Sequence, residues 1–251
     1  MLHDTLLIYR RQVRFSLRQP AWLVFALVQP VMYLALFGPL LEQVAKTPGF
    51  PPGDAWQVFV PGLLVQLGIF GTLYVGFGMI EEIRDGVIDR MRVSPLSRVA
   101  ILLGHVLRDA TVLLVQAAIL TTMGVAFGLT LTWQAIVGTV VVVLLLATAF
   151  ASVSYGIAIV AKDEEPLIGV LNLAAPPLLL LSGILLPMSL APGWLQRVAD
   201  INPLSHVVTG LRRTFLGEIG TATVAWGFLA AVGMTVVCVA VASRAFQREN
   251  P

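Results

Sequence analysis

The feature that most constrains this chain is the run of residues 110–161, which contains no Asp, Glu, Lys or Arg. Similar charge-free runs cover residues 19–41 and 55–80. Over the whole chain 57% of residues are hydrophobic and 12% are charged, which is far from the average of soluble domains. We therefore expect the chain in a lipid bilayer, where a helix of roughly 20 residues crosses the hydrocarbon.

These runs predict an all-α polytopic membrane protein whose residues 1–251 form a single transmembrane domain. Residues 110–161 extend over parts of two helices, because the only polar break lies at residues 130–134. No polar block is long enough for a separate soluble domain. The six predicted spans are residues 20–41, 57–80, 99–128, 135–161, 167–187 and 223–242.

The first 18 residues predict a helix that lies on the membrane surface. A helical stripe carries Leu2, Leu6, Tyr9, Val13 and Leu17, with Arg10, Arg11, Arg14 and Arg18 beside and behind it. This pattern is typical of an interfacial helix on an anionic leaflet. The alternative is a basic flank that precedes the first span and has no further role.

Residues 81–95 are the one dense block of both signs of charge. At helical spacing Ile83, Val87 and Met91 form an apolar stripe, and acidic residues recur four apart on the other side. We expect a short amphipathic helix at the membrane surface that ends near Pro95. His105, Arg108 and Asp109 then interrupt the next apolar run, so its first turns should protrude from the membrane or line a cavity near this block.

Residues 188–222 are too polar to span and too apolar for a plain loop. We expect short helices that dip into the outer leaflet before the last span. The residues that mark this re-entrant segment are Trp194, Asn202, Pro203 and His206.

The distribution of basic residues sets the orientation. Six spans place both termini and the charged block on one side, and that side receives most of the arginines. By the positive-inside rule, both termini lie in the cytoplasm and the protein in the cell membrane.

The sequence contains no motif for catalysis, metal binding or cofactor binding. It lacks the G-x-x-x-x-G-K-[ST] phosphate loop, and its three histidines are too dispersed to suggest a metal site. The net charge of +2 does not suggest a nucleic-acid partner. An enzyme is not expected.

The central parts of the six spans also lack Asp, Glu, Lys and Arg, the ionisable side chains that ion-coupled transporters place at membrane depth. Their uncharged polar side chains either line a pathway for an amphiphile or only bond neighbouring helices. The candidates for a pathway are Gln29, Tyr33, Gln66, Tyr74, Gln116 and Asn172.

The charged block resembles the motif that follows the second span in the type-2 family of ABC export permeases of the daunorubicin-resistance type. Glu82, Gly86, Val87, Ile88, Met91, Ser94 and Pro95 match its places, with Val87 where the family often has Thr. The Asn202-Pro203-Leu204-Ser205 segment is similar to the family's Asn-Pro segment before the last span. The resemblance covers the whole chain in length, helix number and motif order.

The resemblance implies a permease that pairs with a second copy or a paralogue and docks two copies of an ATP-binding subunit, which holds ATP and Mg²⁺. The block would be the coupling helix, with the alternative that it is a solvated loop with local ion pairs. Its residues are Glu82, Arg84, Asp85, Gly86, Val87, Ile88, Arg90, Met91 and Pro95.

The implied function is efflux of a lipophilic or amphipathic compound such as a drug, an antibiotic or a lipid. Export of a polysaccharide or glycolipid is the alternative within the family. A channel or scaffold that needs no nucleotide is the alternative outside it.

Overall fold

The computed structural model describes residues 2–18, 20–48, 50–86, 98–161 and 163–248, and every regular element within these residues is helical. The all-α prediction is confirmed. The elements are α1 (Leu2–Arg18), α2 (Pro20–Val44), α3 (Ala55–Leu73), α4 (Val75–Arg84), α6 (Arg98–Ala126), α7 (Trp133–Ala161), α8 (Glu164–Leu181), a 3-10 turn (Met188–Leu190), α9 (Gly193–Ile201), α10 (Pro203–Phe215) and α11 (Ala222–Arg248).

Six segments of the described residues are long and apolar enough to cross a membrane. They correspond to the six predicted spans, and α3 and α4 together form the second one. These segments are Leu27–Val44, Ala55–Arg84, Leu103–Ala126, Trp133–Ala161, Glu164–Leu181 and Ala222–Ala245.

Among the differences from the predicted bounds, two change the course of a spanning helix. The second span is interrupted at Tyr74 and continues to Arg84, four residues beyond its predicted end. The fifth helix ends at Leu181, whereas we predicted helix to residue 187. Gly183, at φ +71°, adopts a left-handed conformation that an α-helix does not allow, so the chain turns there.

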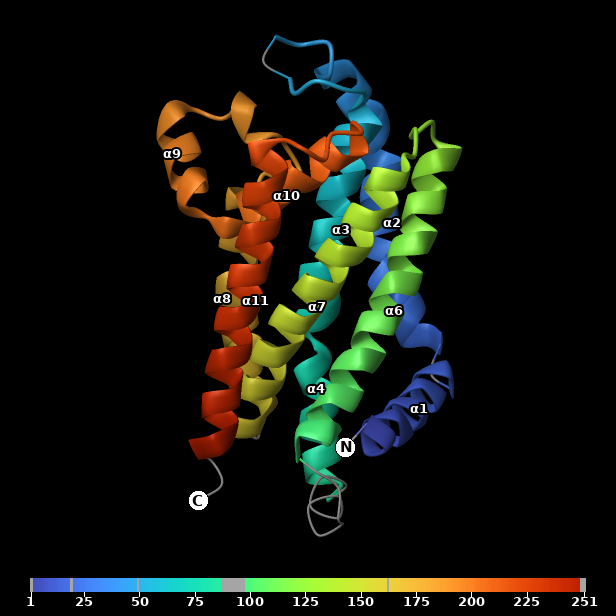
Figure 1. Cartoon of the computed structure of the whole chain (residues 1–251), viewed down its shortest axis with the longest axis vertical. Coiled ribbons are helices and arrows are strands. Elements are labelled where there is room, and N and C mark those ends of the chain that lie inside the picture. Colours follow the sequence, from blue (N-terminus) through green and yellow to red (C-terminus); the bar gives the residue numbers. More distant parts are fainter. Residues whose placement is uncertain (1, 19, 49, 87–97, 162, 249–251) are drawn as a thin grey trace.

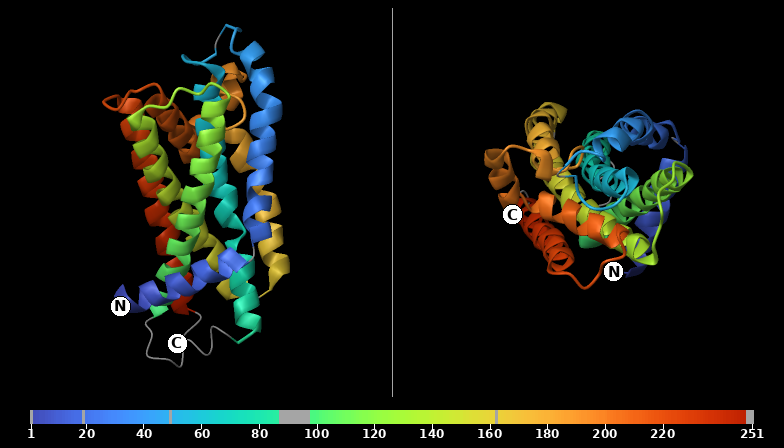
Figure 2. Two further views of the ribbon diagram at one scale, coloured as in Figure 1. Left: turned by 90° about the vertical axis from the view of Figure 1, so that its right-hand side faces the viewer. Right: turned by 90° about the horizontal axis from the view of Figure 1, so that it is seen from above.

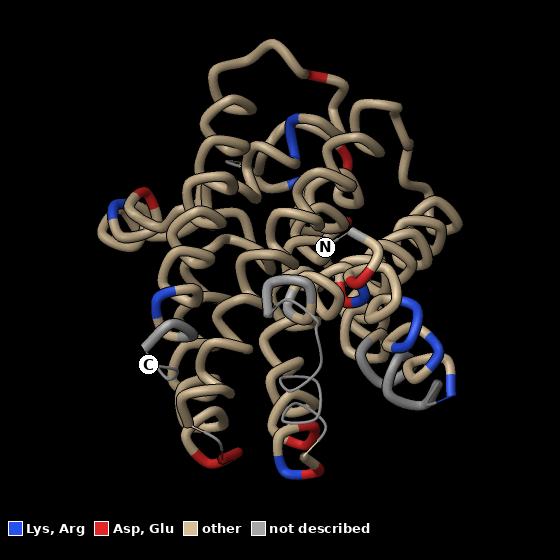
Figure 3. The backbone as a smooth tube through the Cα atoms, turned by 60° about the horizontal axis from the view of Figure 1, so that its bottom comes forward, with Lys and Arg blue, Asp and Glu red and all other residues tan. Residues whose placement is uncertain are grey.

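The long helices run side by side, and the short ones lie at the two ends of the bundle (Figure 1). Helix α1 crosses one end, where the last turn of α11 also lies, and we call this the terminal end (Figure 2). Helices α9 and α10 lie at the opposite, distal end (Figure 1). Charged residues concentrate towards the ends of the helices, as Figure 3 shows.

Helix α3 forms the centre of the bundle. In the apolar 18-residue stretch within Ala55–Arg84, 78% of the residues are buried, compared with 11% in α8 and 17% in the corresponding stretch of α11. The largest buried side chains around α3 include Phe59, Leu146 and Phe215. Helices α8 and α11 therefore present most of their apolar surface outwards, as expected of helices that face lipid or a second protein.

Helix α1 packs against α6 through a face that the sequence did not single out. Thr5, Ile8 and Gln12 are buried there, and a Cβ on Gly104 of α6 would lie 2.6 Å from Cγ2 of Ile8. Members of the predicted leucine stripe, such as Leu6 and Leu17, are exposed instead. The leucines are thus available to lipid, while a mixed polar and apolar stripe holds the helix in place.

Candidate functional site

The second span is broken where α3 meets α4, and a side chain from α7 stabilises the break. The hydroxyl of Ser154 donates to the carbonyl of Leu73 (2.6 Å) and accepts from the backbone N–H of Gly76 (2.9 Å). A Cβ on Gly76 would lie 2.7 Å from the Ser154 carbonyl oxygen, so only glycine allows this close approach. Helix α4 is therefore a separate rigid segment that joins α3 at Tyr74.

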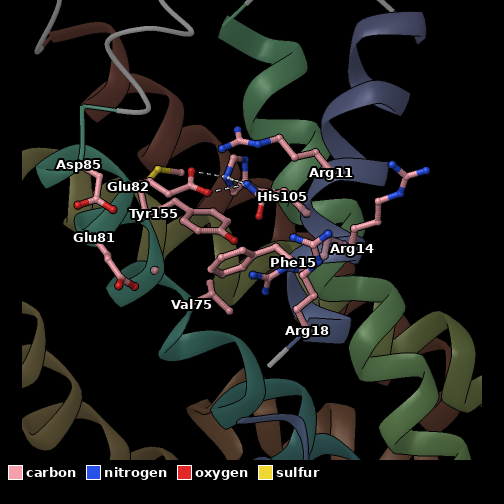
Figure 4. Close-up of a pocket in the computed structure, with 14 residues that line it drawn as sticks. Arg11, Arg14, Phe15, Arg18, Val75, Glu81, Glu82, Asp85, His105 and Tyr155 are labelled. Carbon is pink, nitrogen blue, oxygen red and sulfur yellow. Dashed lines mark hydrogen bonds and ion pairs between the residues drawn. The ribbon is translucent and has the colours of Figure 1, made fainter. Parts of the chain in front are cut away.

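Glu82, near the end of α4, is the centre of a hydrogen-bonded cluster that joins three helices (Figure 4). Its carboxylate accepts from Nε2 of Gln12 on α1 at 2.7 Å and lies 3.0 Å from Nε2 of His105 on α6. Gln12 Nε2 and His105 Nε2 are themselves 2.8 Å apart. The other ring nitrogen of His105, Nδ1, donates to the Ile101 carbonyl at 2.8 Å, which fixes the orientation of the imidazole.

A second group of polar side chains extends this cluster to α7. Asp109 on α6 accepts from Arg108 at 2.5 Å and from the hydroxyl of Tyr155, and the carboxylate is almost completely buried. The Tyr155 ring stands edge-on to His105, with centroids 5.8 Å apart. A buried carboxylate requires such partners because desolvation is costly. We call Gln12, Glu82, His105, Asp109 and Tyr155 the polar cluster.

The last residues of α4 also contact the turn before α8. Arg84 donates to Asp163 at 2.9 Å and to Glu164 at 2.6 Å, and all three side chains are about half exposed. Helix α4 ends there, because Asp85 caps it and Gly86 follows with φ +65°. Glu82 and Arg84 thus belong to the end of the second span and not to a separate helix beginning at residue 81.

The remaining residues of the predicted coupling helix lie outside the described residues. These are Val87, Ile88, Arg90, Met91 and Pro95. The described part ends at Gly86 and resumes at Arg98, at the terminal end of the bundle.

Two cavities of about 600 Å³ each lie beside the polar cluster. The first is bounded by α1, α4, α6 and α7, and its lining includes Arg11, Arg14, Arg18, Glu81, Glu82, Asp85, His105 and Arg108. The second includes Tyr74, Gln116, Arg84, Asp109 and Glu164. We predicted that the turns carrying His105, Arg108 and Asp109 either protrude from the membrane or line a cavity near the charged block, and these three residues do line the two cavities.

The structure brings two of the six candidate pathway residues together, since Tyr74 and Gln116 line the second cavity. The other four lie apart. Gln29 donates to Tyr33 on α2 at 3.3 Å, and Asn172 is exposed on α8. Gln66 is buried in α3, where neither atom of its side-chain amide has a hydrogen-bond partner among the described residues.

At the distal end, the buried Arg212 of α10 joins α3 to the chain that follows α8. Its guanidinium donates to the carbonyls of Val58 (2.8 Å), Gly183 (2.7 Å) and Ile184 (3.4 Å). Burial lowers the pKa of Arg212 to about 10, so the group is charged at neutral pH. The last two carbonyls lie in the non-helical turn and lack helical partners, and Arg212 supplies the donors that they need.

The residues that marked the predicted re-entrant segment lie in α9 and α10. Asn202 caps α10 by accepting from the backbone N–H of Leu204 at 3.0 Å, and Pro203 occupies the first helical position. His206 contacts the Asp200 carbonyl at 2.8 Å, and Trp194 is two-thirds exposed. Asn202 and Pro203 therefore have a structural explanation, and the depth of this segment in the membrane stays a prediction.

The described residues contain no group of three or more His, Cys, Asp and Glu side chains that could hold a metal ion. Sequence reasoning also missed Gln12 and Tyr155 as partners of Glu82 and Asp109. The signal was weak, because each is a single polar residue within a helix and only the packing of four helices brings them together.

Comparison with known proteins shows similarity to one transporter family over most of the chain. The family model of ABC-2 type transporters matches residues 3–216. The chain is 26% identical over 233 residues to the daunorubicin resistance ABC transporter permease protein DrrB1 of Streptomyces coeruleorubidus, which covers 92% of this chain and 81% of that protein. It is 27% identical over 206 residues to nodulation protein J of Neorhizobium galegae, covering 79% and 76%. Identity to the putative transport permease ycf38 of Cyanophora paradoxa is 27% over 197 residues, covering 78% and 68%.

Proposed function

Because the chain belongs to the ABC-2 type transporter family, we propose that it is the membrane subunit of an exporter driven by ATP hydrolysis on a separate subunit. The resemblance inferred from the sequence is confirmed by this membership and by the permease relatives. The chain has no phosphate loop of its own. A partner would supply the nucleotide site with its ATP and Mg²⁺, and two copies of it would serve a pair of permease subunits.

The observation that carries this proposal is the position of Glu82. It lies five residues before the segment 87–97 and bonds α4 to α1 and α6. A force applied to that segment by a docked partner would pull on α4, and α4 can pivot against α3 at Tyr74. The polar cluster would then pass the movement to α6 and α7, because Asp109 and Tyr155 continue the hydrogen bonds from His105.

We propose a lipophilic or amphipathic compound as the exported substrate. Charged residues lie towards the helix ends (Figure 3), and the candidate pathway residues carry amides and phenols. Such groups can orient an amphiphile without the desolvation cost of a charge. The relative from Streptomyces is named for resistance to daunorubicin. The orientation follows from the positive-inside rule, which places both termini, and therefore the terminal end of the bundle, in the cytoplasm. Efflux would then move the compound from the terminal end towards the distal end.

The test is ATP-dependent transport by the assembled complex. Inverted membrane vesicles would contain the permease together with an ATP-binding subunit that co-purifies with it, and a fluorescent lipophilic cation would be added outside. We expect accumulation that requires ATP and stops when the phosphate-loop lysine of the partner is replaced. Flux that is unchanged without ATP or without the partner would show a channel and refute the exporter.

A further inference from the structure

The first cavity has two walls of opposite charge. Arg11, Arg14 and Arg18 of α1 form one wall, and Glu81 and Asp85 at the end of α4 form the other (Figure 4). The cavity holds about 600 Å³, which is ample for a headgroup of a few heavy atoms but small for a whole lipid. It lies at the terminal end of the bundle, where the second span ends.

Several charged groups in these walls have no partner within the described part of the chain. The carboxylate of Glu82 already bonds Gln12 and His105. The side chains of Arg14, Arg18 and Glu81 make no ion pair or hydrogen bond with the described residues. Arg18 is exposed and lines the cavity, so its guanidinium group is available to a bound anion. An oxygen-rich anion in the cavity would give it a partner.

The cavity is bordered by apolar groups as well as by charges. Phe15 and Val75 lie between the two charged walls in Figure 4, and exposed Leu6 and Leu17 are on the same helix as the arginines. A helix with arginines on one side and exposed leucines on another is typical of the boundary between headgroups and acyl chains. A site at this boundary, with charged groups for an anion and apolar surface beside them, suits a phospholipid better than a soluble metabolite.

We propose that this cavity binds the headgroup of a phospholipid that carries a primary ammonium, such as phosphatidylethanolamine. The phosphodiester would accept from Arg18, because guanidinium groups suit phosphate oxygens. The ammonium would pair with Glu81 on the opposite wall. A purely anionic headgroup would leave Glu81 without a cation, and a choline headgroup could not donate a hydrogen bond to it.

Such a lipid would bridge α1 and α4 beside the polar cluster, so its occupancy would affect how firmly α4 is held. This site does not depend on the ATP-binding partner. Lipid binding to the permease alone therefore tests it independently of the proposed export.

The experiment is native mass spectrometry of the purified, full-length permease in detergent, titrated separately with phosphatidylethanolamine, phosphatidylcholine and phosphatidylglycerol of matched acyl chains. We expect a first binding event that is about tenfold tighter for phosphatidylethanolamine than for the other two. Arg18→Gln should weaken that event about tenfold, and Glu81→Gln should remove the preference between lipids. The matched control is Arg10→Gln, an exposed arginine on the same helix that does not line the cavity.

Equal binding of the three lipids by the parent protein would overturn the proposal, as would unchanged binding by Arg18→Gln. Displacement of the lipid by millimolar phosphoethanolamine would show that a soluble zwitterion is the ligand and would also overturn it. Arg18→Gln and Glu81→Gln change exposed side chains, and an unchanged melting temperature would show that each variant is folded.

Discussion

The break in the second span depends on one hydroxyl group. Replacing Ser154 with Ala leaves the Leu73 carbonyl and the Gly76 N–H buried without their present partners. An unsatisfied buried polar group costs about 1–3 kcal/mol, and the gain in helix propensity from Ser to Ala returns about 0.5 kcal/mol. We therefore expect Ser154→Ala to lower stability by about 2–4 kcal/mol.

The assay is thermal unfolding of the purified permease in detergent, followed by intrinsic fluorescence. For a protein of this size the loss corresponds to a decrease in Tm of about 5–10 °C. The matched control is Ser152→Ala, two residues earlier in α7. Its buried hydroxyl bonds only the Thr148 carbonyl of its own helix, at 2.6 Å, so we expect a Tm within about 2 °C of the parent.

Equal melting temperatures for the two variants would refute this reasoning. They would mean that α3 and α4 close into one continuous helix when Ser154 is absent, or that the break is stable without it. In the first case helix α4 would not be a separate segment and the proposed pivot at Tyr74 would lose its structural basis. In the second case the hydroxyl of Ser154 would not be what stabilises the break.

Three further predictions concern the two ends of the bundle. Arg212→Leu should lower stability by about 3 kcal/mol, measured by the same melting assay, because it removes the donors to the carbonyls of Val58 and Gly183, whereas exposed Arg197→Leu should have little effect. Gly104→Ala should displace α1 and increase the labelling of a cysteine at buried Thr5, with Gly169→Ala, which has open space, as the unaffected control. A cysteine at Lys46 should react with an impermeant reagent from outside intact cells, and reaction only in inverted vesicles would reverse the proposed orientation.

The sequence was sufficient to predict six helices that are long and apolar enough to cross a membrane, because an uncharged run of this length satisfies its backbone groups in a bilayer only as a helix. It could not predict the interruption at Tyr74. That break requires the hydroxyl of Ser154 and the absence of a side chain at Gly76, and these residues are 78 positions apart. A single Gly and a single Ser inside apolar helices carry no local signal for such a contact.

The polar cluster was predictable only in part. His105, Arg108 and Asp109 were conspicuous because charges interrupt an apolar run, and their placement in a cavity near the charged block followed from that. Their partners were not predictable from periodicity. The leucine stripe of α1 did not indicate which face of this helix packs against α6, because in a bilayer the apolar side of a helix is directed to lipid as readily as to protein.

The central claim is that the segment after α4 docks the ATP-binding subunit, and co-purification of that subunit with a tagged permease tests it most directly. Val87, which lies outside the described residues, belongs to the apolar stripe predicted from the sequence. Val87→Asp would bury an unpaired charge in the contact, so we predict that the partner no longer co-purifies. Asp85→Ala changes an exposed residue and should lower the free energy of binding to the partner by on the order of 1 kcal/mol or less, so the complex should form as in the parent. If Val87→Asp retains the partner as well as the parent does, the docking claim is wrong.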